Sequence, residues 1–240
     1  MDTDSKVNIM DFFINNSVVS TDDIYLYFKS IDPNINRTTI NWRVYNWTKK
    51  GILKRVGRGV YELGKTKEFN IVLSTKASKL GLYLKKHFPY IDFCIWENSV
   101  INQFAHYLTN NNNIFIDVEA SAKESVILYL KERYNSVYDV KDIRNNIEDY
   151  TNSIIVRRLV SASPIVKNNK IYIPSIEKIL VDILIDKEFF YYQNNDFYSI
   201  FEIVFNNYTI NVNSMLRYAS RKGKKEEIKN KLHLYIDKKQ

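Results

Sequence analysis

The sequence predicts an α+β protein: an N-terminal winged helix-turn-helix followed by a larger α/β domain with a helical C-terminal part. Three observations predict this class. Three amphipathic helical segments and a hairpin occupy the first 66 residues, strand-like and helix-like runs alternate from residue 68 to about 188, and the chain is mostly helical from 189 onward. Because the charge balance changes near residue 67, we expect two domains, residues 1–67 and 68–240.

The three N-terminal helices are predicted from apolar residues that recur every three or four positions. Thr21, followed by two aspartates, is the expected N-cap of the second helix, which stops at Asp32-Pro33. Gly51 stands where a glycine ends the third helix. The expected inward residues are Val7, Met10, Phe13 and Ile14 in the first helix, Ile24, Tyr27, Phe28 and Ile31 in the second, and Ile40, Val44 and Trp47 in the third.

The outward face of the third helix contains no acidic residue and includes two aromatic side chains. Thr and Asn side chains can hydrogen-bond base edges, and Lys or Arg can pair with phosphate. We therefore expect this helix to enter a DNA groove, the alternative being that another domain covers Trp42 and Tyr45. The expected DNA-binding residues here are Arg37, Thr38, Asn41, Trp42, Tyr45 and Lys49.

A basic hairpin is predicted directly after these helices. The chain has six glycines, and Gly51, Gly57 and Gly59 fall within the stretch "GILKRVGRGVYEL". Alternating apolar residues on both sides of "GRG" indicate two short strands, and glycine tolerates the backbone angles of a tight turn. The tip would present Arg58, with Lys54 and Arg55 on the preceding strand, as the wing of a DNA-binding domain. A purely structural hairpin would need the turn but not the charge.

The net charge of +8 is concentrated in two blocks. Residues 36–67 carry +8 and residues 217–240 carry +6, whereas residues 1–35 carry −4. Such blocks are typical of proteins with a polyanionic partner, although a solvated surface is the simpler explanation of any charged run.

The second domain is predicted to alternate strands and helices. We expect strands at 70–74, 92–97, 113–120, 136–140, 153–164 and 170–174, and helices at 76–88, 98–109, 123–134 and 175–186, the last with Ser175 as its N-cap.

One pair of acids in this domain suggests an alternative enzymatic function. Asp117 and Glu119 alternate on a predicted strand, with Asp92 and Lys123 nearby, and two carboxylates on one strand face can hold Mg²⁺. This would make the protein a metal-dependent nuclease or nucleotidyltransferase with a DNA-targeting winged helix. The spacing matches neither class well, and a solvated strand edge is the simpler explanation of the acids. We expect no catalytic residue, metal or cofactor.

Neither a membrane span nor a secretion signal is predicted. No run approaches the roughly 18 apolar residues that cross a bilayer, and the N-terminus is acidic. Cys94 has no second thiol with which to form a disulfide. We expect a cytoplasmic protein.

Four segments together resemble the AbiEi-type antitoxins of bacterial abortive-infection toxin–antitoxin systems. They are "GILKRVGRGVY", "CIWENSVINQF", "PSIEKILVDIL" and "YTINVNSMLRYASRKGK". The resemblance implies an N-terminal domain that represses its own operon at inverted repeats in double-stranded DNA. It also implies a C-terminal domain that counteracts a nucleotidyltransferase toxin.

The resemblance supports Arg55, Arg58 and Tyr61 as wing positions, and Arg217, Tyr218 and Arg221 as part of a C-terminal motif. With Lys224 and Lys225, the last three are the expected partner-binding residues. A DNA-binding module that merely oligomerises is a further alternative.

Overall fold

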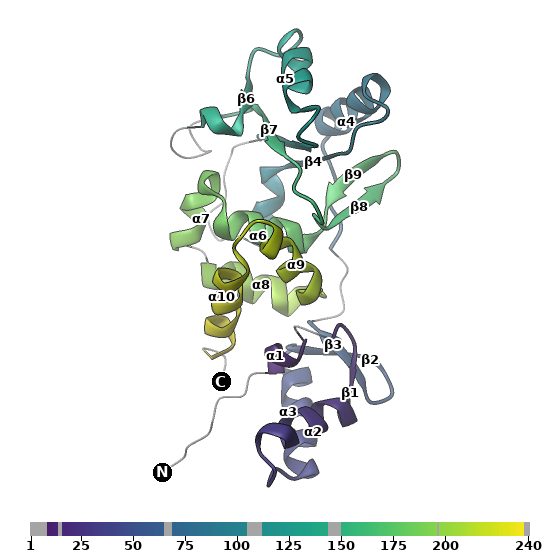
Figure 1. Ribbon diagram of the computed structural model, residues 1–240, viewed down its shortest axis with the longest axis vertical. Coiled ribbons are helices and arrows are strands. Elements are labelled where there is room, and N and C mark those ends of the chain that lie inside the picture. The colour runs from purple at the N-terminus through teal and green to yellow at the C-terminus, as the bar shows by residue number, and fades with distance from the viewer. Residues whose placement is uncertain are drawn as a thin grey trace. The chain divides into compact units, whose positions relative to one another are not determined.

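The computed structural model describes residues 9–13, 16–64, 69–104, 112–143, 150–195 and 197–237 (Figure 1). They form a mixed α/β protein, which confirms the predicted class. The chain divides into two compact units. The first contains Met1–Phe69, Phe201–Arg217 and Lys225–Gln240, and the second contains Asn70–Ile200 and Tyr218–Lys224. The first unit thus includes C-terminal residues that we had expected in the second domain.

The N-terminal part of the first unit contains the predicted three helices followed by a hairpin, and in addition a short strand, β1, that was not predicted. A small antiparallel sheet of order β1-β3-β2 accompanies the helices. The elements are α1 (Ile9–Phe13), β1 (Val19–Ser20), α2 (Thr21–Ile31), α3 (Arg37–Lys49), β2 (Leu53–Gly57) and β3 (Val60–Leu63).

The N-cap of α2 lies one residue earlier than predicted. Ser20, not Thr21, is the N-cap: its hydroxyl accepts a hydrogen bond from the backbone N–H of Asp23 at 3.0 Å. The Asp23 carboxylate in turn accepts the backbone N–H of Ser20 at 2.9 Å, which completes a capping box. These bonds with Ser20 lower the pKa of Asp23.

Apolar side chains from α2 and α3 form the core beneath this sheet. Ile24, Phe28, Ile40 and Val44 are buried as predicted, and the half-buried Trp47 stacks on Phe28 with ring centroids 5.8 Å apart. Ile31 is 42% exposed, so its predicted inward position is wrong: it is the last residue of α2, where the helix ends in solvent. Of the predicted inward residues of α1, Phe13 is buried; Val7, Ile14 and the Met10 side chain lie outside the described part.

The second unit is built on a four-stranded sheet of order β4-β5-β7-β6. β4 (Phe93–Glu97) runs antiparallel to β5 (Ile114–Val118), whereas β5, β7 (Ile154–Arg158) and β6 (Val137–Asp139) are parallel. The helices α4 (Thr75–His87) and α5 (Lys123–Lys131) pack on one face. The helix α6 (Ile176–Ile185) meets the other face, where its side chains contact Asp117 and Arg157.

The remaining elements are short helices and one hairpin. Three segments of the second unit differ from the prediction. Residues 70–74 do not form the expected strand. Of the helix expected at 98–109, Asn98–Gln103 is a 3₁₀ helix, η1, and the residues from 105 onward lie outside the described part. A strand, β8, was not predicted at Ile165–Asn168, where it pairs with β9 (Ile171–Pro174).

From residue 187 the described chain is helical, as predicted. Its elements are η4 (Lys187–Phe189), α7 (Phe190–Asn195), α8 (Phe197–Asn207), α9 (Val212–Arg221) and α10 (Lys225–Asp237). One further short element, the 3₁₀ helix η2 (Val140–Asp142), directly follows β6. Within the described residues, no helix has the length and apolar character needed to cross a membrane.

Candidate functional site

The outward face of α3 exposes two aromatic residues. Trp42 is 65% and Tyr45 62% exposed, while Ile40 and Val44 on the opposite side are buried. Thr38, Asn41 and Lys49 are exposed on the same helix. Single exposed apolar residues are normal, but two neighbouring large aromatics on one helix face are typical of a contact surface.

The start of α3 is well ordered. The side chain of Asn36 accepts hydrogen bonds from the backbone N–H and the hydroxyl of Thr39, at 2.7 and 2.9 Å. Arg37 forms an ion pair with Asp22, and its guanidinium lies 5.5 Å from the ring centre of Tyr25. Both partners of the ion pair remain more than half exposed, so Arg37 can still reach a phosphate.

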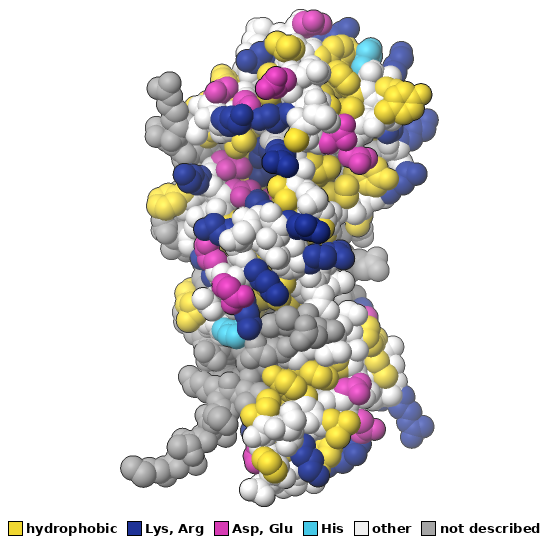
Figure 2. All heavy atoms as spheres, in the orientation of Figure 1, with side chains coloured by type: hydrophobic (Ala, Val, Ile, Leu, Met, Phe, Trp, Pro, Cys, Tyr) yellow, Lys and Arg dark blue, Asp and Glu magenta, His cyan; other side chains and the backbone are white. Residues whose placement is uncertain are grey.

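The hairpin carries its cations at the tip, as predicted. Gly59 has a φ of 71°, and its carbonyl accepts the backbone N–H of Thr21 at 2.8 Å, which ties the turn to α2. Arg58 is exposed between the two glycines, and Arg55 donates from Nε to the carbonyl of Gly57 at 3.1 Å. Figure 2 shows lysine and arginine side chains among hydrophobic ones on this unit.

These cations are not neutralised by neighbouring acids. Among the described residues, no acidic side chain forms an ion pair with Lys49, Lys54, Arg55 or Arg58. Lys54 is half-buried and the other three are exposed. The charge of the hairpin and of the end of α3 is therefore available to an anionic partner.

The basic C-terminal segment contains the helix α9, which has one buried apolar side. Val212, Met215, Leu216 and Ala219 are buried. Gly223, with a φ of 70°, follows the end of α9. The side chains of Arg217, Arg221, Lys224 and Lys225 are exposed.

Tyr218 does not belong to that exposed surface. Only 2% of its surface is exposed, and its hydroxyl donates to Asp182 Oδ1 at 2.7 Å. Its position three residues from Met215 places it on the buried side of α9. The expectation that its side chain contacts a partner is therefore corrected: Tyr218 is a core residue.

A buried cluster of charged groups, centred on Asp182, joins the sheet to α6 in the second unit. Arg157 holds Asp117 with two bonds of 2.6 and 3.1 Å and reaches Asp182 at 2.7 Å. Lys178 bridges the same two aspartates at 2.7 and 2.6 Å. Asp186 and Glu188 also belong to the cluster and accept hydrogen bonds from Arg157. The last two members are Lys222, which contacts Asp182 and Asp186, and Tyr218.

The neighbouring opposite charges keep Asp117, Asp182, Arg157 and Lys178 ionised although they are buried. Burial by itself would raise the pKa of Asp117 and of Asp182. The neighbouring cations, above all Arg157 beside Asp117 and Lys178 beside Asp182, have the larger effect, so both pKa values lie below the usual range. Burial lowers the pKa of Arg157 and Lys178, and Asp117 and Asp182 raise both well above normal.

Asp186 is the exception within the cluster. Burial, and then the charge of Asp182, raise the pKa of Asp186 to about 7, although Lys222 lies 2.6 Å away and opposes the shift. The described cluster contains one carboxylate more than it has cations. Asp186 therefore holds a proton more readily than an ordinary aspartate.

The structure does not place Asp117 and Glu119 in one open site. Both oxygens of Asp117 accept from Arg157 or Lys178, and the side chain is buried. Glu119 lies beyond the end of β5 and accepts from the Ser121 hydroxyl at 3.0 Å. Lys123 pairs instead with Asp139 at 2.6 Å. In the described part of the chain, no three His, Cys, Asp or Glu side chains are grouped to hold a metal ion.

The cluster was missed because charged residues are usually assigned to the surface. A signal was nevertheless present: Lys178 and Asp182 stand four residues apart in the otherwise apolar "IEKILVDILI". Arg157 likewise ends the apolar run of β7. A charged residue inside an apolar run is buried only if it is paired, so these positions point to partners elsewhere in the core.

Comparison with known proteins gives a family but no activity. A model described as a family of unknown function, DUF6577, matches residues 39–238. That range includes α3 from Thr39 onward, the hairpin and every member of the buried cluster, but not Arg37 and Thr38. None of the curated proteins is similar enough to the chain to count as a match. Because the match covers most of the sequence, the chain belongs to the DUF6577 family.

Proposed function

We propose that the first unit binds double-stranded DNA as a winged helix-turn-helix, with α3 in a major groove and the β2-β3 hairpin against the backbone or the adjacent minor groove. The observation that carries the proposal is the exposed, acid-free face of α3 with Trp42 and Tyr45. A helix of this kind presents its N-terminal residues to base edges. Thr38 and Asn41 occupy that end of α3.

DNA explains this surface better than a protein partner does. Lys49, Arg55 and Arg58 follow the aromatic pair along the chain, and none of them has an acidic partner among the described residues, so their charge favours a polyanion. Such cations displace condensed counterions from a duplex, which supplies most sequence-independent affinity. The aromatic and amide groups of α3 would then contribute the sequence-dependent part.

The test is a titration of the purified protein with labelled duplexes. We expect DNA from immediately upstream of its own reading frame to bind more tightly than a random duplex. Tyr45→Ala should weaken binding, and Thr38→Ala, Asn41→Ala and Trp42→Ala should reduce the preference for the upstream DNA. The matched control is Tyr90→Ala, because Tyr90 is 97% exposed in the other unit. Equal binding of all variants would refute the assignment of α3.

On the resemblance to AbiEi-type antitoxins, we further propose that the protein represses its own operon and counteracts a nucleotidyltransferase toxin. It would act by binding, without a metal or cofactor. The exposed Arg217, Arg221, Lys224 and Lys225 supply a basic surface for the toxin or for the RNA on which it acts.

Co-expression with a toxic neighbouring gene tests this second function. The double variant Arg217→Glu with Lys225→Glu should lose rescue of growth and still bind operator DNA. The control, Lys167→Glu with Lys170→Glu, reverses two exposed charges on the β8-β9 hairpin and should rescue normally. The absence of a toxic neighbour would contradict the antitoxin function. Metal-dependent cleavage of DNA by the purified protein would contradict the proposal of a non-enzymatic role.

A further inference from the structure

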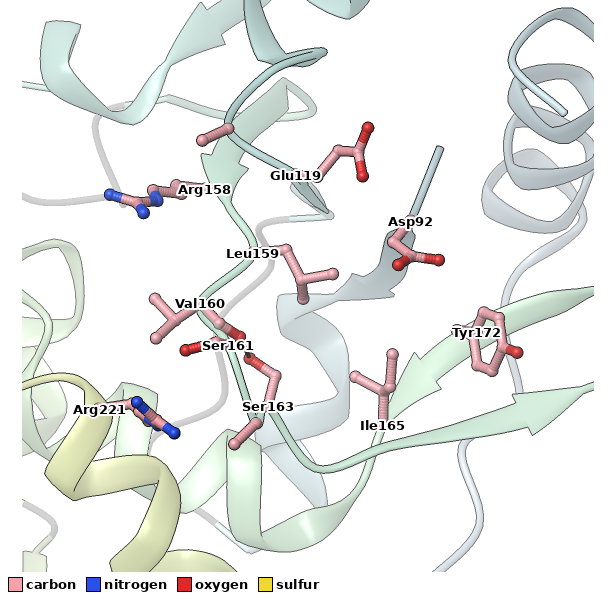
Figure 3. A pocket seen from close by; sticks show the side chains of 12 residues that line it. Asp92, Glu119, Arg158, Leu159, Val160, Ser161, Ser163, Ile165, Tyr172 and Arg221 are labelled. Atoms are coloured by element: carbon pink, nitrogen blue, oxygen red, sulfur yellow. Dashed lines mark hydrogen bonds between the residues drawn. The ribbon is translucent and has the colours of Figure 1, made fainter. Parts of the chain in front are cut away.

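A cavity of about 620 Å³ opens in the second unit where its parallel strands end (Figure 3). Its wall includes Glu119 after β5, Arg158 at the end of β7, residues 159–163 of the loop that follows, and Asp92 before β4. Tyr172 of β9 and Arg221 at the end of α9 complete it. The volume lies within the range of about 300–1,000 Å³ that small-molecule sites occupy.

The position of the cavity is one at which α/β sheets bind ligands. The chain leaves β5 toward α5 on one face of the sheet, and it leaves the adjacent β7 through the β8-β9 hairpin toward α6 on the other. Neighbouring parallel strands whose connections go to opposite faces leave a crevice at their carboxyl ends.

The floor of the cavity is fixed by backbone hydrogen bonds. Leu159 donates to the carbonyl of Val118 at 2.8 Å, and Glu119 donates to the carbonyl of Asp92 at 3.0 Å. In the same wall Ala162 has a φ of 58°, a conformation that residues other than glycine adopt rarely and that persists where surrounding structure imposes it. Backbone contacts therefore hold this wall of the cavity in place.

Two arginines line one side of the cavity. Figure 3 places Arg158 and Arg221 on the side opposite Asp92, Glu119 and Tyr172. Both arginine side chains are exposed, and neither forms an ion pair with a described residue, whereas the adjacent Arg157 is fully paired in the buried cluster. Guanidinium groups match phosphate with paired N–H donors, so two of them at one cavity favour a phosphorylated ligand.

The opposite side of the cavity offers an aromatic ring and two carboxylates. The Tyr172 ring provides a flat apolar surface on which a planar group can stack. Asp92 and Glu119 accept hydrogen bonds and therefore select N–H or O–H donors. A bare phosphate would use the arginine side alone, and a carboxylate ligand with no donor groups would be repelled by the acids.

We propose that this cavity binds a nucleoside phosphate. The phosphate lies at Arg158 and Arg221, and the base stacks on Tyr172 with its N–H groups directed to Asp92. This binding site is separate from the α3 and hairpin residues assigned to DNA. Its failure in an experiment would leave the DNA-binding proposal unaffected.

The test is calorimetric titration of the full-length protein with purine and pyrimidine nucleoside mono-, di- and triphosphates. The corresponding nucleosides and inorganic phosphate serve as the two kinds of partial ligand. We expect at least one nucleotide to bind at least tenfold more tightly than its nucleoside and than inorganic phosphate. Arg158→Gln and Arg221→Gln should each weaken it by tenfold or more.

Matched controls separate the cavity from general charge and folding. Arg217→Gln removes an exposed arginine of the same helix, α9, that does not line the cavity, and should bind normally. Tyr172→Ala should weaken nucleotides but not inorganic phosphate, whereas Tyr90→Ala should change neither.

Three results would overturn the proposal. They are the absence of nucleotide binding at concentrations of about 1 mM, inorganic phosphate binding as tightly as any nucleotide, and unchanged nucleotide affinity in folded Arg158→Gln and Arg221→Gln proteins.

Discussion

At the scale of the residue, Asp182 organises the core of the second unit. Its carboxylate accepts from Arg157, Lys178, Lys222 and Tyr218, and it is fully buried. A buried ion pair contributes little net stability compared with well-packed apolar residues, but removing one partner leaves the others buried and uncompensated. Asp182 therefore matters through the cations that depend on it.

We predict that Asp182→Asn lowers the free energy of unfolding by about 3 to 5 kcal/mol, because three buried cations lose their shared negative charge. Urea denaturation followed by circular dichroism measures the change. Asp142→Asn makes the same chemical change at an exposed position and should cost less than about 0.5 kcal/mol. Equal effects of the two substitutions would contradict the role given to Asp182.

The raised pKa of Asp186 predicts a pH dependence of stability. Its pKa is about 7 in the folded protein and near 3.8 when unfolded, so the folded state binds the extra proton between these values. The protonated Asp186 therefore stabilises the folded state fully below about pH 4, and this stabilisation is lost as the pH rises to about 7. We expect the free energy of unfolding to fall by about 1 to 2 kcal/mol from pH 5 to pH 7.

Asp186→Asn isolates this contribution, because asparagine resembles the protonated acid at every pH. The variant should lack the decline between pH 5 and pH 7, whereas Asp142→Asn should retain it. Urea unfolding at several pH values measures both. A decline of the same size in Asp186→Asn and in the unaltered protein would assign the effect to other groups.

Single residues were predictable where helical periodicity decides their side. Periodicity places Ile40 and Val44 inward and therefore Trp42 and Tyr45 outward, and the structure agrees. It could not reveal the Asp182 cluster, because its members come from segments as far apart in the sequence as β5, β7, α6 and α9. Tyr218 was misassigned for the same reason: its partner lies 36 residues away.

At the scale of the element, the β2-β3 hairpin is shaped by its glycines and by a register shift. The pairing changes between Arg55 and Gly57, which leaves Val56 unpaired and 42% exposed. Such a bulge bends the strand and increases its local twist. Arg58 then stands at the tip, between Gly57 and Gly59, with no acid paired to it among the described residues.

We predict that Arg58→Ala weakens DNA binding by about 1 to 2 kcal/mol and reduces the salt slope by about one, because one phosphate contact is lost. Anisotropy titrations over a range of salt concentrations measure both quantities. Lys167→Ala, which removes an exposed lysine from strand β8 of the other hairpin, should change neither. If the Arg58→Ala slope equals that of the unaltered protein, the hairpin does not touch the phosphate backbone.

Elements were predictable where apolar spacing and burial agree. The three N-terminal helices and most strands of the large sheet satisfy this condition. Residues 70–74 do not: Ile71 is buried but Val72 is 87% exposed, and the segment pairs with no strand of the described chain. An apolar run alone therefore could not distinguish a strand from an extended linker.

At the scale of the whole molecule, the first unit is assembled from both ends of the chain. Gly64, directly after β3, forms a β-bridge with Thr209, and Phe69 packs edge-on against Tyr208 with ring centroids 5.1 Å apart. Phe205, which lies close to Tyr208 in the sequence, packs against Tyr235 with ring centroids 5.4 Å apart. Contiguous sequence patterns could not predict this association, because nothing in either segment identifies the other.

We predict that Gly64→Ala destabilises the first unit by about 3 kcal/mol. Gly64 has a φ of 86°, and an added Cβ would lie 2.4 Å from the carbonyl oxygen of Tyr208, so the bridge to Thr209 must open or shift. Gly223→Ala is the matched control: its φ is 70° but an added Cβ meets nothing within 4 Å, so it should cost only the backbone strain of about 1 kcal/mol. Urea unfolding and hydrogen exchange of the amides of α3 measure the two losses. If Gly64→Ala costs no more than Gly223→Ala, contact with the segment around Tyr208 does not stabilise the N-terminal part of the protein.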